Sequence, residues 1–133
     1  MAFLPPWHVS HTLAQLLHAR YVSCPSMGRQ ALVVITALGN EADARTLVTA
    51  LVEERLIACG TVLGGARSIY RWEGRVREES EVVVLLKTDV AKWDALRAAV
   101  ERQHPYEVPE LLALPVVQGL DRYLSWLESE VGA

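Results

Sequence analysis

The apolar positions of this chain change their spacing several times, and each change predicts a new element of secondary structure. Residues 31–37 form a short run rich in Val and Ile that is followed by Gly39, as is typical of a buried strand. Asn40 then suits a helix N-cap, and the apolar residues beyond it recur at helical spacing as far as Leu51. The first part of the chain therefore predicts a strand followed by an amphipathic helix.

A long β-hairpin is predicted next. Residues 57–72 have strand character throughout, and the two glycines in their middle, Gly64-Gly65, mark a bulge or a bend. Glu73-Gly74 suits a tight turn. The return strand, residues 75–88, is charged in its first half and continuously apolar from Val82 to Leu86.

The rest of the chain repeats the first pattern. Asp89 caps a second helix, residues 111–116 form another strand, and a last helix begins near Asp121. The two halves are alike: each has a strand ending near a threonine (Thr36, Thr88), a capped helix and a second strand. The order predicts an α+β fold, a ferredoxin-like split βαβ sandwich with a long protruding β-hairpin and an extra C-terminal helix.

Two features of this pattern predict that the protein is an oligomer. At about 3.3 Å per residue, the first hairpin strand would span about 50 Å if straight, whereas a domain of about 100 residues is only about 35 Å across. The segment from Val82 to Leu86 is apolar on both faces, although helices cover only one face of such a sheet. A second copy would cover the free face and the hairpin edges. The alternative is a bent hairpin that folds back onto its own sheet.

Composition places the chain among globular proteins with one main domain. Residues 31–133 form this domain, and residues 1–30, which contain no Asp or Glu, are expected to be a loosely attached or partly helical extension. Hydrophobic residues make up 51% and charged residues 22% of the chain. The net charge of −3 argues against nucleic-acid binding, and no apolar run reaches the roughly 18 residues of a membrane span. Two cysteines without metal-ligand spacing favour a reduced, cytoplasmic setting.

Residues 104–110, here called the proline strip, hold the candidate metal ligands. Pro105 and Pro109 push the residues before them toward extended backbone. His104 is the best candidate, since imidazole suits copper and zinc, and Glu110 could add a carboxylate. Six extended residues reach about 20 Å, so both bind one ion only if the strip turns or two subunits contribute. The alternative is a structural His104 that bonds to backbone near a subunit boundary.

The hairpin and the proline strip also predict a cleft or an interface. Tyr70 and Trp72 share one face of the hairpin by strand alternation, and Arg67 and Arg71 share the other. With Tyr106 of the strip, these residues indicate either an intersubunit pocket for an anionic effector or ordinary interface packing. In the second case, the arginines would pair with hairpin carboxylates at positions 78, 79 and 81. Without a Ser-His-Asp order or a Gly-rich phosphate loop, the chain is not expected to be an enzyme.

Several motifs in order resemble the CutA family of divalent-cation tolerance proteins. These motifs are EERLIAC (residues 53–59), SIYRWEG (68–74), LKT (86–88), HPYEVPE (104–110) and YLSWL (123–127). The resemblance implies a ferredoxin-like fold, a compact homotrimer, a cytoplasmic location and a link to tolerance of copper and other divalent metals. Trimers of this type are similar to those of the PII signalling proteins, which bind small effectors in clefts between subunits.

The resemblance also bears on copper as a possible cofactor. It implies a copper-binding set made of a cysteine on the first strand and two adjacent histidines before the proline. Here the matching positions are Ile35 and Gln103, and only His104 remains. The sequence thus predicts weak copper binding in a divalent-cation tolerance protein, or instead a PII-like trimeric module that binds a small effector or a partner protein.

Overall fold

The computed structural model describes residues 30–132, and all but the last residue of the predicted N-terminal extension lies outside this range. The order of its elements confirms the predicted order of strands and helices. The elements are β1 (Ala31–Leu38), α2 (Glu41–Glu53), β2 (Cys59–Trp72), β3 (Arg75–Asp89), the 3-10 turn η1 (Val90–Lys92), α3 (Trp93–Gln103), β4 (Leu112–Pro115) and α4 (Asp121–Val131).

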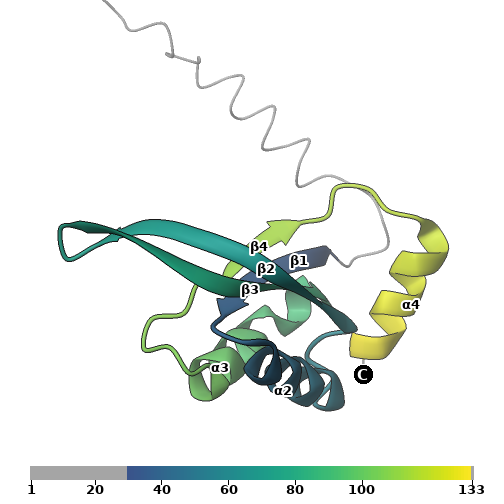
Figure 1. The fold of residues 1–133 in the computed structure, drawn as a ribbon. Helices are drawn as coiled ribbons and strands as arrows, with labels where there is room; N and C mark the ends of the chain where they lie inside the picture. Colours follow the sequence, from purple (N-terminus) through teal and green to yellow (C-terminus); the bar gives the residue numbers. More distant parts are fainter. Residues whose placement is uncertain (1–29, 133) are drawn as a thin grey trace, which may run out of the picture.

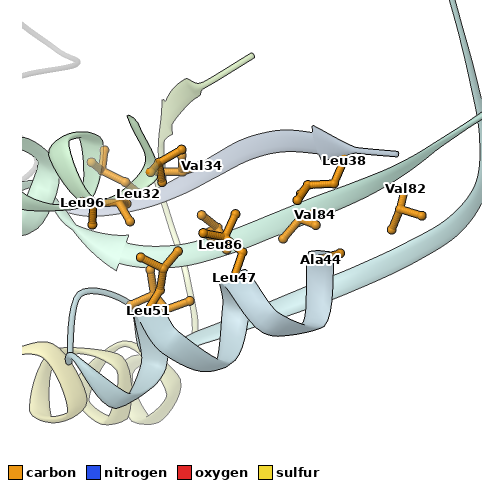
Figure 2. Close-up of a cluster of buried hydrophobic side chains, with 13 residues drawn as sticks. Leu32, Val34, Leu38, Ala44, Leu47, Leu51, Val82, Val84, Leu86 and Leu96 are labelled. Atoms are coloured by element: carbon orange, nitrogen blue, oxygen red, sulfur yellow. The ribbon is translucent and has the colours of Figure 1, made fainter. Parts of the chain in front are cut away.

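The four strands form one antiparallel sheet in the order β2-β3-β1-β4. Helices α2 and α3 lie under one face of this sheet, and α4 lies at its end (Figure 1). The core fills the space between the sheet and the two helices (Figure 2). Its labelled side chains are Leu32, Val34, Leu38, Ala44, Leu47, Leu51, Val82, Val84, Leu86 and Leu96. This arrangement confirms the predicted ferredoxin-like sandwich.

Local hydrogen bonds explain where the helices begin and end. The Asp43 backbone N–H donates to Oδ1 of Asn40 at 2.8 Å, which confirms the predicted N-cap of α2. Asp89 caps the turn η1, which leads into α3. Helix α2 ends at Glu53, and the positive φ of Arg55, 57°, allows the Leu56 N–H to reach back to the Leu51 carbonyl. None of the helices within residues 30–132 is long and apolar enough to cross a membrane.

Two buried threonines form hydrogen bonds between the two halves of the fold. The Thr36 hydroxyl on β1 donates to the Glu110 carbonyl, just before β4, at 2.7 Å. The Thr88 hydroxyl on β3 donates to the Leu56 carbonyl, just before β2, also at 2.7 Å. Because a buried hydroxyl needs a partner, each threonine fixes the path of a chain segment far away in the sequence.

The β2–β3 hairpin projects beyond the body of the domain (Figure 1). Glu73 and Gly74 both have positive φ, 49° and 78°, as the two central residues of a type I′ turn require. Between the pairs Leu63–Val83 and Ala66–Glu81, strand β2 holds one residue more than β3. The predicted glycine pair thus forms a β-bulge.

The face of the sheet away from α2 and α3 is apolar and largely uncovered; we call it the open face. Its side chains alternate with those of the core along each strand. The apolar ones are Val33, Ile35, Leu63, Val83, Leu85, Leu112 and Leu114, and near one end of the face Lys87 donates to the Thr61 hydroxyl at 2.6 Å. Helix α4 covers only the end of this face, near Ala31 and Ala58. Leu112 remains 55% exposed. The strand from Val82 to Leu86 therefore has one covered and one uncovered face, as the sequence predicts.

Candidate functional site

A groove of about 660 Å³ lies between the projecting hairpin and the proline strip, and we call it the aromatic groove. Its volume is within the range of small-molecule sites in proteins. The residues that line it come mainly from these two segments: Ser68, Ile69, Tyr70, Trp72, Arg77, Glu79, Glu81, Tyr106, Glu107, Val108 and Glu110. The structure thus brings together four predicted residues, namely Tyr70, Trp72, Tyr106 and Glu110.

The hairpin wall of the groove follows from strand alternation and register. The tight turn pairs Trp72 with Arg75, so Tyr70 lies opposite Arg77 and Ser68 lies opposite Glu79. Residues opposite each other in an antiparallel pair share a face. Ala37 also lines the groove, and it pairs with Val83 of the open face. The groove therefore continues the open face toward the hairpin.

The strip wall of the groove is fixed at both ends to strand β1. The His104 ring bonds to the Ala37 carbonyl at 2.9 Å, and the Glu110 carbonyl accepts from neighbouring Thr36. Because these anchors are adjacent in β1, the chain between them must turn outward. This turn brings Tyr106 to the hairpin, where its hydroxyl donates to Oε2 of Glu81 at 3.4 Å.

The buried His104 ring is engaged through both nitrogens. Its Nδ1 accepts from the Tyr106 backbone N–H at 3.1 Å, so the proton resides on Nε2, which donates to the Ala37 carbonyl. The residue is 6% exposed and does not line the groove. In this tautomer neither nitrogen has a free lone pair for a metal ion. This geometry fits the alternative of a structural histidine.

The two predicted metal ligands are directed to different places. The Glu110 side chain belongs to the groove lining, whereas the His104 ring packs inside against β1. Among residues 30–132, no three His, Cys, Asp or Glu side chains are grouped so that they could hold a metal ion. A metal site at His104 and Glu110 stays a prediction that this geometry does not favour.

The two predicted arginines lie outside the aromatic groove. Nη1 of Arg67 is 3.8 Å from Oε1 of Glu78, on the other face of the hairpin, and both side chains are more than half exposed. Such an exposed pair contributes little to stability. Arg71 shares this face by alternation and pairs in register with Val76. The aromatic groove therefore lacks the two guanidinium groups that would have favoured an anionic effector.

Burial and nearby carboxylates raise the pKa values of two tyrosines of the groove, Tyr70 and Tyr106. Burial raises the pKa of Tyr106, and the charge and hydrogen bond of Glu81 raise it further. Partial burial also raises the pKa of Tyr70, together with the hydrogen bond and charge of Glu79. Burial is the larger cause for both tyrosines, and the charge of Arg77 opposes that of Glu79 at Tyr70.

Tyr106 is expected to ionise only above the ordinary phenol value of 10.0, and Glu81→Gln is expected to lower its pKa. Since the pKa is higher in the folded chain than in the unfolded one, the stabilisation from protonated Tyr106 is complete below that value. It is lost as the pH rises further. An NMR titration of the Tyr106 ring carbon tests this, with Glu78→Gln on the opposite hairpin face as the control. A Tyr106 pKa at or below 10.0 would contradict the expected effect.

Four charged residues were not predicted to line the groove: Arg77, Glu79, Glu81 and Glu107. Two of them, Glu79 and Glu81, were considered as partners of the hairpin arginines. The sequence did contain a pattern that could have placed the three residues of β3 in the groove. A two-residue turn at Glu73-Gly74 sets the register of the whole arm, and alternation then assigns each residue to a face. Glu107 could not be placed in this way, because the path of the strip depends on its anchors to β1.

The fold and the groove define an α+β protein of the ferredoxin-like class with a projecting hairpin. Residues 32–130 match the family model described as "CutA1 divalent ion tolerance protein". The chain therefore belongs to the CutA1 family, as the sequence motifs indicate.

Individual relatives agree with this assignment. The divalent-cation tolerance protein CutA of Thermus thermophilus is 45% identical over 100 residues, which are 75% of this chain and 97% of the relative. That of Pectobacterium atrosepticum is 45% identical over 101 residues, 76% of this chain and 92% of the relative. The solved structure of the Thermus thermophilus protein superimposes with a TM-score of 0.75 at 44% identity, covering 77% of this chain and 99% of the other. The crystal structure of CutA1 from Oryza sativa superimposes with a TM-score of 0.74 at 35% identity, covering 76% of this chain and 93% of the other.

Proposed function

We propose that this protein acts in divalent-cation tolerance as a cytoplasmic homotrimer that binds a small effector in the aromatic groove and catalyses no reaction. Its relatives are named divalent-cation tolerance proteins, and this supports the role in tolerance. The choice of a binding module over a metal holder rests on one observation, the engagement of both His104 nitrogens by backbone groups. The aromatic groove then remains the best candidate for a binding site.

Assembly into a homotrimer is supported by the surfaces that a single chain leaves uncovered. The open face carries a continuous apolar surface, with Leu112 and Leu114 at least half exposed. Exposed apolar surface of this kind is typical of protein interfaces. Strands β2 and β4 are also the edges of the sheet, where backbone groups are available for pairing with another chain. Because the groove continues the open face, assembly would place it beside a subunit boundary.

Growth in the presence of metal tests the proposed role. A strain from which the gene for this protein has been deleted is expected to grow more poorly than its parent at raised copper. A plasmid with the wild-type gene should restore growth, whereas a gene with the groove substitution Trp72→Ala should not, although both proteins accumulate equally. Equal growth of the deletion strain and its parent across copper, zinc and other divalent metals would overturn the role in tolerance.

A further inference from the structure

The aromatic groove has the composition of a site for positively charged ligands. Among its lining residues, carboxylates outnumber the guanidinium of Arg77 four to one. Three of its side chains are also aromatic: Tyr70, Trp72 and Tyr106. Aromatic faces attract cations through the negative charge above the ring, and carboxylates accept hydrogen bonds from ammonium and guanidinium groups.

The polar groups of the groove are held in place by contacts within the chain. Glu81 accepts the Tyr106 hydroxyl, and Tyr106 in turn donates its backbone N–H to the His104 ring. The ring itself is fixed on β1 and stacks in a tilted arrangement against Tyr106, with ring centroids 4.9 Å apart. The buried His104 thus positions the strip wall of the groove, so this wall is preorganised before a ligand arrives.

Of the four hairpin arginines, two are directed away from the groove, whereas Arg75, opposite Trp72, and Arg77, opposite Tyr70, share its face. Arg67 pairs with Glu78 on the opposite face of the hairpin, and Arg71 shares that face. Arg77 lies beside Tyr70 within the groove, where Glu79 is its neighbour two positions along the same face. The other carboxylates of the lining, Glu107 and Glu110, come from the strip and are exposed. The lining nevertheless has four carboxylates and one guanidinium, and this excess of negative charge favours a cation over an anion.

We infer that the aromatic groove binds a small organic cation, one that combines a flat or apolar body with an amidinium, guanidinium or ammonium group. This inference rests on the proposal that the groove is the binding site of the protein, and it specifies the chemistry of the ligand. The body of such a ligand would lie against Trp72 and Tyr70, and its cationic head would face the carboxylates of Glu79 and Glu81. The charge of this ligand is opposite to that of the anionic effector that the sequence alone suggested.

Three nearly isosteric probes that differ in charge test this inference on the full-length protein. Benzamidine is cationic, benzamide is neutral and benzoate is anionic, so calorimetric or NMR titrations isolate the effect of charge. Benzamidine is expected to bind saturably and about fivefold more tightly than benzamide, with benzoate the weakest of the three. Added salt should weaken the binding of benzamidine, since the carboxylates are solvent-accessible.

A matched pair of substitutions locates the binding. Glu79→Gln removes one carboxylate from the groove and is expected to weaken benzamidine binding about threefold. Glu78→Gln removes the same charge from the next residue of β3, on the other face, and should leave the affinity unchanged.

Three results would overturn the inference. Benzoate binding as tightly as benzamidine would show that the charge of the ligand is wrong while the groove remains a site. No saturable binding of benzamidine, or equal affinities for the Glu79→Gln and Glu78→Gln variants, would show that the groove does not select organic cations. These binding results are separate from the growth experiment, which can succeed or fail independently.

Discussion

Val83→Asp is expected to convert the proposed homotrimer into folded monomers. Val83 lies in the middle of the open face, paired in register with Ala37 and Leu63. A carboxylate there would be transferred from water into an apolar interface, at a cost of several kcal/mol for each subunit. In a monomer the same side chain would stay partly accessible to water, so the chain can still fold. Light scattering should report a mass three times that of the 14.8-kDa chain for the wild type and a single chain for the variant.

The control for this experiment is Val52→Asp on α2. Val52 is 40% exposed on the helical layer, away from the open face, so the same chemical change should leave the assembly intact. Circular dichroism should show that both variants keep the wild-type content of helix and strand. A wild-type mass of one chain at micromolar concentration, or an unchanged mass for Val83→Asp, would contradict the role of the open face in assembly.

His104→Phe is expected to lower the free energy of unfolding by about 3 kcal/mol. The substitution keeps an aromatic ring of similar shape but removes both polar atoms. It leaves the Ala37 carbonyl and the Tyr106 N–H without the partners they have at 2.9 Å and 3.1 Å. The bond to the Ala37 carbonyl is buried, so water cannot replace it, whereas the Tyr106 N–H is only partly buried and contributes less to the cost. Urea denaturation of the wild type and the variant measures the difference.

Gln103→Phe provides the neighbouring control. Gln103 is exposed at the end of α3, so its replacement is expected to change the stability by less than about 0.5 kcal/mol.

Copper titrations of the wild type and His104→Phe distinguish the structural role from metal ligation. The heats should be equal if His104 serves the fold. A clear loss of copper affinity in the variant, without a loss of stability, would instead favour the predicted metal site.

The elements of this fold could be predicted because each depends on nearby residues. The apolar run at positions 31–37, the cap at Asn40 and the glycines at positions 64 and 65 act within a few residues of themselves. The hairpin faces could be predicted for the same reason, since strand alternation separates Tyr70 and Trp72 from Arg67 and Arg71. Local periodicity thus accounts for the sheet, its two faces and the projecting arm.

The candidate site was predicted only in part. Tyr70, Trp72, Tyr106 and Glu110 do meet in one groove, but the sequence left open whether the strip turns so that Glu110 approaches His104. Both residues are polar and lie six positions apart in a stiff segment. Their separate environments arise because Thr36 and Ala37 hold the two ends of the proline strip. Those partners are 74 and 67 positions away in the sequence, so no local pattern contains them.

The sequence by itself determined the order of the elements, the apolar open face and the membership in a family, because these depend on residue type and spacing. Only the tertiary structure decided that the His104 ring is directed inward and that carboxylates surround the aromatic side chains of the groove. The physical reason is that a hydrogen-bonded anchor to a distant strand sets the path of the strip. That path determines which charges lie beside which rings, and hence which ligand the groove attracts.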